Sequence, residues 1–147
     1  MTSAQPTSAE SAKTVFSFDV RSHGRGLYDF TSEVSARVRE SGKKEGLCTV
    51  FVRHTSASLI VQENADPSVQ TDLDAFLSRL VPDGDAIFRH TDEGPDDMPS
   101  HVRAALTATS IGIPFVDGKL MLGRWQAIYL FEHRHAPHTR QIVVHVG

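Results

Sequence analysis

Twelve residues near the middle of the chain, from His90 to His101, concentrate side chains that can do chemistry. The stretch reads HTDEGPDDMPSH and combines two histidines with the carboxylates of Asp92, Glu93, Asp96 and Asp97. Carboxylates this close in sequence repel one another unless a cation, an arginine or a protonated histidine lies among them. The stretch therefore predicts a bound counter-charge.

A helix must position the end of this stretch. Asp97 and Pro99 are helix-start signals, and they are followed at helical spacing by Val102, Ala105, Leu106 and Thr109. His101 then lies in the first turn, at the edge of the predicted buried face. In a plainer interpretation Asp96 and Asp97 only cap the helix, but capping needs one carboxylate and leaves both histidines unexplained.

A third histidine, His54, ends a strand. Residues 47–53 and 58–62 read as two strands joined by the polar segment His54-Thr55-Ser56. Strand alternation places His54 on the same face as Cys48, Val50 and Val52. A histidine at such a place is either a satisfied core residue or a ligand, and the sequence leaves both open.

The remaining pattern predicts further strands and helices. Strands are expected from residue 13, with Phe16, Phe18 and Val20 on one face, around the turn Asp117-Gly118, and over 123–133 and 140–146. One helix begins at Thr31 and ends near Gly42, and a clearer one begins with Asp66 as N-cap and Pro67 at its first position. Its apolar stripe comprises Val69, Leu73, Phe76, Leu77 and Leu80.

Composition narrows the class of protein. The chain has 147 residues, 39% of them hydrophobic, and a formal net charge of −3, which fits one domain and argues against nucleic acid as a partner. The single cysteine, Cys48, forms no intrachain disulfide. No apolar run approaches the ~20 residues that cross a bilayer, so we expect a cytoplasmic protein without a membrane partner. Residues 1–12, rich in Ser, Thr and Ala, are expected to be disordered, ahead of a single domain over 13–147.

Five segments together resemble the YjbQ-like (UPF0047) family, whose members are described as secondary thiamine-phosphate synthases. They are HTSAS at 54–58, ENADP at 63–67, EGPDDMPSH at 93–101, LGRWQAIYLFEHR at 122–134 and RQIVVHVG at 140–147. The resemblance covers nearly all of the chain after residue 13. The chain departs from the family at Arg124, where a small Thr or Ser usually precedes the tryptophan.

The resemblance implies an α+β fold, with antiparallel sandwich-like or barrel-like sheets, helices packed on them, and assembly into homotrimers. It also implies a transferase that joins hydroxymethylpyrimidine diphosphate to a thiazole phosphate and releases diphosphate. The main enzymes for that step are TIM barrels of ~250 residues, so any such activity here needs an unrelated site. The alternative is a non-catalytic trimer that binds a metal ion or a small phosphorylated ligand.

Displacement of diphosphate builds negative charge on the leaving group, which a divalent metal ion can neutralise. Carboxylates favour Mg²⁺ and histidines favour Zn²⁺, so the residues leave the metal open. The predicted metal ligands are His90, Asp96, Asp97 and His101.

We further expect four polar residues to converge on one catalytic pocket, because each lies at the margin of an apolar surface; they are His54, Asp97, His101 and Glu132. The predicted substrate-binding residues fall into two groups. Phosphate contacts are expected from Thr55, Ser56 and Arg134. A stacking wall is expected from Trp125 and Gln126.

Overall fold

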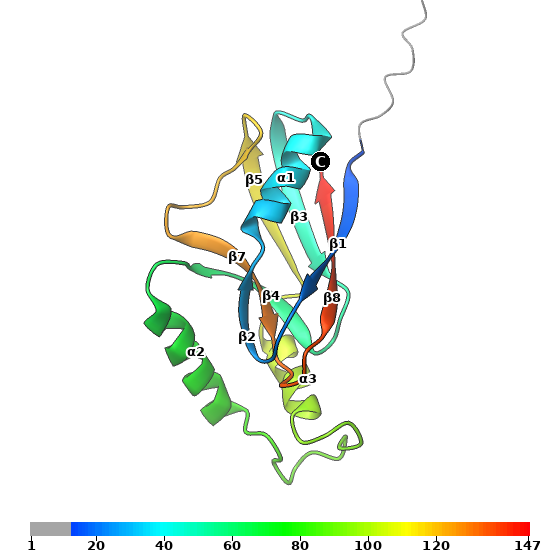
Figure 1. Ribbon diagram of the computed structural model, residues 1–147, viewed down its shortest axis with the longest axis vertical. Coiled ribbons are helices and arrows are strands. Elements are labelled where there is room, and N and C mark those ends of the chain that lie inside the picture. Colours follow the sequence, from blue (N-terminus) through cyan, green and yellow to red (C-terminus); the bar gives the residue numbers. More distant parts are fainter. Residues whose placement is uncertain (1–12) are drawn as a thin grey trace, which may run out of the picture.

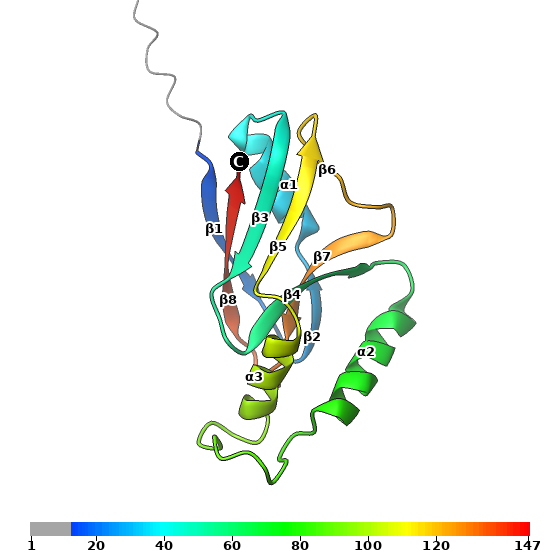
Figure 2. The same ribbon diagram turned by 180° about the vertical axis from the view of Figure 1, so that it is seen from behind.

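The computed structural model describes residues 13–147, and the segment expected to be disordered, 1–12, lies outside the described residues. Within residues 13–147 the chain folds into two antiparallel sheets with three helices around them (Figures 1 and 2). The α+β class and the antiparallel pairing are as expected.

The larger sheet has five strands. Its spatial order is β1-β8-β3-β5-β6, with bounds Val15–Arg21 (β1), Thr139–Val146 (β8), Glu45–Val52 (β3), Ser110–Val116 (β5) and Lys119–Leu120 (β6). As the sequence predicts, β5 and β6 meet at Asp117 and Gly118, which both have positive φ, 53° and 70°. That backbone is typical of a two-residue hairpin turn.

The smaller sheet has three strands in the order β2-β7-β4, with bounds Gly26–Asp29 (β2), Gln126–Glu132 (β7) and Ala57–Glu63 (β4). The sequence predicts no strand at the position of β2. In the register of β7, Gln126 pairs with Glu63 at one end and Glu132 pairs with Ala57 at the other. This register brings the segment 54–56 to the Glu132 end.

The hydrophobic core lies between the two sheets. One face of β8 is buried through Ile142, Val144 and Val146, as predicted, and packs in the same cluster as Leu59 and Leu130 of the smaller sheet. Helix α1 (Thr31–Ser41) covers the core with Val34 and Val38, and both views place it against the larger sheet. The helix begins at Thr31 as expected; Phe30 occupies the N-cap position without a side-chain capping hydrogen bond, and Gly42 ends the helix in the left-handed region.

Helix α2 (Pro67–Leu80) has the predicted start but leaves its stripe largely uncovered. Asp66 caps it, because Oδ1 accepts a hydrogen bond from the N–H of Ser68 at 2.9 Å. Of the predicted apolar stripe only Leu77 is buried, whereas Phe76 is 63% exposed. Figures 1 and 2 show the helix standing away from the sheets.

Helix α3 (Asp97–Leu106) buries a different face from the predicted one. It begins at Asp97, two residues before Pro99, and it buries Asp97, Pro99, Ser100, Arg103 and Ala104, while Leu106 is exposed. Polar contacts explain the difference, because Ser100 Oγ donates to the carbonyl of His133 at 2.8 Å. Helix α3 is thus held to the end of β7 largely through polar groups.

Candidate functional site

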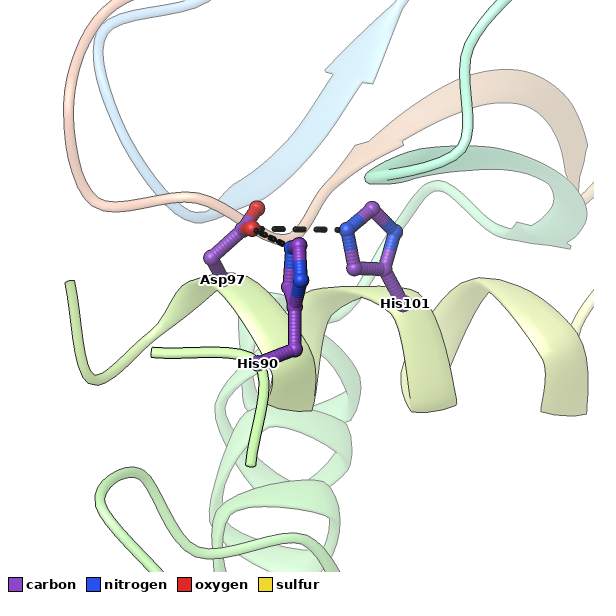
Figure 3. Close-up of side chains that lie close together, drawn as sticks. All are labelled: His90, Asp97 and His101. Atoms are coloured by element: carbon purple, nitrogen blue, oxygen red, sulfur yellow. Dashed lines mark hydrogen bonds and ion pairs between the residues drawn. The ribbon is translucent and has the colours of Figure 1, made fainter. Parts of the chain in front are cut away.

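His90, Asp97 and His101 form a compact cluster at the start of α3. Oδ2 of Asp97 lies 2.8 Å from Nε2 of His90 and 3.4 Å from Nε2 of His101. Figure 3 shows Asp97 and His101 projecting from neighbouring turns of the helix, with His90 reaching them from the preceding loop. The (i, i+4) spacing of Asp97 and His101 places both on one helix face. One ligand atom from each residue fits within 4.8 Å of the others.

Arg134 supplies the counter-charge that the acidic stretch requires. Its Nη1 lies 2.9 Å from Oδ1 of Asp97, its Nε lies 3.1 Å from Oδ2 of Asp96, and its Nη2 donates to the carbonyl of Glu93 at 2.9 Å. The three guanidinium nitrogens therefore bind the loop before α3 and the first residue of that helix. They hold Asp97 so that Oδ1 faces Arg134 and Oδ2 faces the two imidazoles.

The orientation of His101 follows from its other hydrogen bond. Nδ1 lies 2.9 Å from the carbonyl oxygen of Thr55, and a carbonyl can only accept, so Nδ1 carries a proton. In neutral His101 the lone pair is then on Nε2, which faces the carboxylate of Asp97. Two acceptors face each other across 3.4 Å, an arrangement that becomes favourable when a cation or a second proton lies between them.

Asp96, a predicted metal ligand, lies outside this cluster. Its Oδ2 accepts from the backbone N–H of His135 at 2.9 Å as well as from Arg134. Burial alone would raise the pKa of Asp96, but these hydrogen bonds outweigh it and the pKa is lowered. Asp96 therefore anchors the loop as a carboxylate and does not face the histidines.

Glu132, predicted to share the pocket, is instead fully buried in an ion pair. Nη2 of Arg140 lies 2.5 Å from Oε2 and Nε lies 2.8 Å from Oε1, while Ser22 Oγ donates to Oε1. Burial would raise the pKa of Glu132, but hydrogen bonds from Arg140 and Ser22 lower it overall. Glu132 is connected to the cluster through Arg134, whose backbone N–H donates to Oε2 at 3.3 Å. Glu132, on the core face of β7, thus helps to position Arg134 and through it the cluster.

His54 and His101 line one cavity of about 250 Å³. Its other walls are Thr55, Ala104, Ala105 and Thr109. As predicted, His54 follows a strand face on which Cys48, Val50 and Val52 are buried. The structure thus brings His54 next to His101, although His54 makes no direct contact with Asp97 among residues 13–147.

A second cavity, of about 260 Å³, lies on the His90 side of the cluster. It is formed by the loop before α3 and by the start of the helix, with Phe88, His90, Thr91, Pro95 and Met98 among its walls. The cluster therefore lies between two cavities.

The predicted phosphate contacts have other partners in the structure. Ser56 Oγ accepts from Nη2 of Arg140 at 2.9 Å, and the carbonyl of Thr55 is bound to His101. Thr55 still lines the cavity with an exposed side chain. Their main visible role is to connect the 54–56 segment to α3 and β8.

Trp125 and Gln126 do not form a wall of this site in one chain, contrary to the expectation. They lie at the start of β7, whereas Glu132 lies at its end, about 20 Å away. Oε1 of Gln126 accepts from the N–H of Gly123 at 2.8 Å, and the guanidinium of Arg124 lies 4.8 Å from the centre of the Trp125 ring. The predicted strand is present but begins at Gln126 rather than at Gly123, and its extended geometry separates the two polar ends.

Several buried polar residues behind the site were missed from the sequence. His133 Nε2 lies 2.8 Å from Ser58 Oγ, and Arg103 is fully buried with Nη2 3.2 Å from Ser78 Oγ. The burial of Arg140 could have been predicted, because it alternates in phase with Ile142, Val144 and Val146 on the buried face of β8. A buried arginine requires a carboxylate partner, and Glu132 was the available one.

The donor set of the cluster fits a metal ion. Tetrahedral zinc with bonds of about 2.0–2.2 Å places its ligand atoms about 3.3 Å apart, and the 3.4 Å between Asp97 and His101 is close to that value. The 2.8 Å between Asp97 and His90 is a hydrogen-bond distance, shorter than the spacing of zinc ligands. Two imidazoles and one carboxylate suit Zn²⁺ better than Mg²⁺. Three protein ligands leave one coordination position for water or substrate.

Among residues 13–147 no helix is long and apolar enough to cross a membrane.

Comparison with known proteins adds relatives along almost the whole chain. It is 57% identical over 128 residues to a UPF0047 protein of Synechocystis sp., with 87% of each chain covered. It is 38% identical over 120 residues to the UPF0047 protein YjbQ of Escherichia coli O157:H7, covering 81% of this chain and 86% of that one.

Solved structures agree with these relatives. An uncharacterised conserved protein of the YjbQ/UPF0047 family from Clostridium acetobutylicum matches with a TM-score of 0.81 and 33% identity, covering 88% of this chain and 97% of that one. A hypothetical protein from Aeropyrum pernix K1 matches with a TM-score of 0.82 and 28% identity, covering 92% and 99%. The family model described as UPF0047 protein YjbQ-like matches residues 16–147. The chain therefore belongs to the YjbQ-like UPF0047 family.

Proposed function

We propose that the chain is a metal-dependent transferase of the thiamine-phosphate synthase type, which joins a pyrimidine carrying an activated methylene to a thiazole phosphate. The reaction class is taken from the family that the five sequence segments resemble, whose members are described as secondary thiamine-phosphate synthases. The observation that carries the proposal is the lone pair of His101 Nε2, which faces Oδ2 of Asp97 at 3.4 Å. A divalent cation bound there and by His90 turns two facing acceptors into ligands.

The residues of the cluster divide the work. A bound metal ion would neutralise the diphosphate leaving group as its C–O bond breaks. Arg134 keeps the carboxylate of Asp97 in place, and the carbonyl of Thr55 keeps the ring of His101 in the metal-binding orientation. Asp96 and Glu132 hold Arg134 through its side chain and its backbone. The catalytic role of His54 stays a prediction.

A non-catalytic binding protein is the second candidate, and one observation favours it. Every nitrogen of the Arg134 guanidinium already has a partner in the loop or at the start of α3, namely Glu93, Asp96 and Asp97. The nearest cation is therefore engaged with protein groups rather than presented to a diphosphate. Such a site binds a metal ion but stabilises a leaving group poorly.

Steady-state kinetics separate the two candidates. Purified protein with Zn²⁺ or Mg²⁺ is mixed with hydroxymethylpyrimidine diphosphate and thiazole phosphate, and diphosphate release is followed. The transferase proposal expects turnover that His101→Ala abolishes while the protein still melts cooperatively. Metal binding by the wild type without turnover would contradict the transferase and favour the binding protein.

We also propose that the chain assembles into a homotrimer, as the resemblance implies. The uncovered stripe of α2 and the exposed Leu106 of α3 support assembly, because monomers rarely leave such a helix face in water. A cytoplasmic location remains the expectation for such a protein.

A further inference from the structure

We propose that His54 determines specificity by donating a hydrogen bond from Nδ1 to an acceptor nitrogen of a planar heteroaromatic ring bound in the cavity that His54 shares with His101. The inference rests on the proposed function, since the ring would belong to the substrate whose phosphates reach the cluster. It gives His54 a binding role in place of the catalytic one expected from the sequence.

The tautomer of His54 follows from its contact with the last strand. The backbone N–H of Gln141 donates to Nε2 of His54 at 2.8 Å. A backbone amide nitrogen can only donate, so Nε2 supplies the lone pair and the proton of neutral His54 is on Nδ1. Burial, and then the positive charge of Arg140, lower the pKa of His54 and keep the ring in this form.

The Nδ1–H of His54 is available to a ligand. Within residues 13–147 it has no hydrogen-bond partner, and it is not among the polar atoms sealed inside the protein. The ring of His54 lines the cavity. A donor of known tautomer is therefore left without a protein partner on a ring that lines the cavity, and a ligand bound there can offer it an acceptor.

The size and walls of the cavity suit a six-membered ring. An apolar cavity of ~150 Å³ can hold benzene, and about 250 Å³ is present here. The methyl groups of Ala104 and Ala105 provide apolar contact, and His101 forms the side toward the cluster. A substituent on a ring in this cavity can therefore reach the atoms that face Asp97.

The site differs from a simple apolar hole in one respect. A cavity lined only by methyl groups binds a benzene and a pyrimidine with little preference, because it offers no polar contact that distinguishes them. An N–H donor at a fixed position increases the affinity for a ring that carries an acceptor nitrogen. The discriminating quantity is therefore the ratio of two affinities, which does not depend on how tightly rings bind in general.

The test compares two rings that differ only in their nitrogens. The probes are 4-amino-5-hydroxymethyl-2-methylpyrimidine and its benzene counterpart, 2-amino-4-methylbenzyl alcohol, with binding followed by ligand-observed NMR at pH 8 with EDTA. We expect wild type to bind the pyrimidine about tenfold more tightly, the effect of one neutral hydrogen bond. In His54→Gln the amide oxygen can replace Nε2 as acceptor for Gln141, but no donor remains at the Nδ1 position, so the ratio should fall to about one.

His54→Asn is the control for a structural effect of the His54→Gln substitution. His54→Asn places its amide N–H where Nδ1–H stood, so it should keep most of the preference for the pyrimidine. An equal preference in wild type and His54→Gln would overturn the proposal, as would the absence of pyrimidine binding to folded wild type at millimolar concentration. Because no metal ion and no turnover are needed, failure of the transferase proposal would leave this result unchanged.

Discussion

His133 and Ser58 share a hydrogen bond of 2.8 Å between Nε2 and Oγ, and both side chains are fully buried. Thr107 extends the contact, with its Oγ1 2.5 Å from that of Ser58. Burial, together with the positive charge of Arg103, lowers the pKa of His133 to about 3. The histidine next to the site is thus a neutral structural residue at physiological pH.

The free energy of unfolding should therefore decrease as the pH is lowered, already in a range where carboxylates are still ionised. His133 takes up a proton near its ordinary pKa of 6.5 when the chain is unfolded, but only near 3 when it is folded. Its contribution is present above pH 6.5 and is lost as pH falls toward 3, by about 1.4 kcal/mol per pH unit. Urea unfolding at pH 5, 6 and 7 measures this slope.

His133→Phe should make the unfolding free energy less dependent on pH between pH 5 and 6. The slope should fall by about 1.4 kcal/mol per pH unit, which corresponds to one proton, because the variant lacks the group that titrates. His23→Asn, which changes an exposed histidine, is the control and should leave the slope unchanged. A His133→Phe protein with the wild-type slope would show that His133 is not the residue responsible.

The buried pair of Glu132 and Arg140 should be the most sensitive polar contact behind the cluster. Glu132→Gln leaves the guanidinium of Arg140 buried without its countercharge, which costs about 3–5 kcal/mol in comparable sites. Equilibrium urea unfolding at pH 7 should show this loss, whereas Glu45→Gln at an exposed position should change stability by less than about 0.5 kcal/mol. Equal effects of the two changes would mean that the pair contributes little.

The same pair predicts the behaviour in acid. Because hydrogen bonds from Arg140 and Ser22 outweigh burial and lower the pKa of Glu132 below its ordinary 4.5, its stabilisation is present above pH 4.5 and is lost as pH falls through the lower folded value. Glu132→Gln should remove this part of the acid dependence. Urea unfolding of the variant between pH 5 and 3 should accordingly give a shallower decline than that of the wild type.

The uncovered face of α2 predicts a concentration-dependent assembly. Phe76 is 63% exposed, and Phe76→Glu places a charge where another copy would pack, so the variant should sediment as a smaller species than the wild type. Thr71→Glu adds the same charge at another exposed position of α2 and should have no effect on assembly. A wild-type protein that is monomeric at micromolar concentration would refute the proposed trimer.

The strands were the most predictable part of the fold. Alternation in β8 and the Asp-Gly turn before β6 depend on neighbours in sequence, so local patterns suffice. Strand β2 was missed because its four residues, three half-buried and Asp29 exposed, gain strand structure only by pairing with β7. Tertiary pairing decided that segment.

The face of α3 could not be predicted from hydrophobicity. Its pattern favours burial of Leu106, yet the helix buries Ser100 and Arg103 because their partners, His133 and Ser78, arrive from distant segments. Asp97 and His101 were found because their helical spacing is local. The contact between Glu132 and Arg140 was not predicted, because it joins the ends of two strands across a loop.

The central claim is that Asp97, His90 and His101 bind a divalent metal ion, and calorimetric titration of metal-free protein with Zn²⁺ tests it most directly. Asp97→Asn removes the charged oxygen that faces both imidazoles, and Asp92→Asn removes an exposed carboxylate from the same loop. The account predicts one site per chain in wild type and in Asp92→Asn, and at least about a hundredfold weaker binding in Asp97→Asn, because a charged ligand is lost. Equal affinities in all three proteins, or no binding to the wild type, would contradict it.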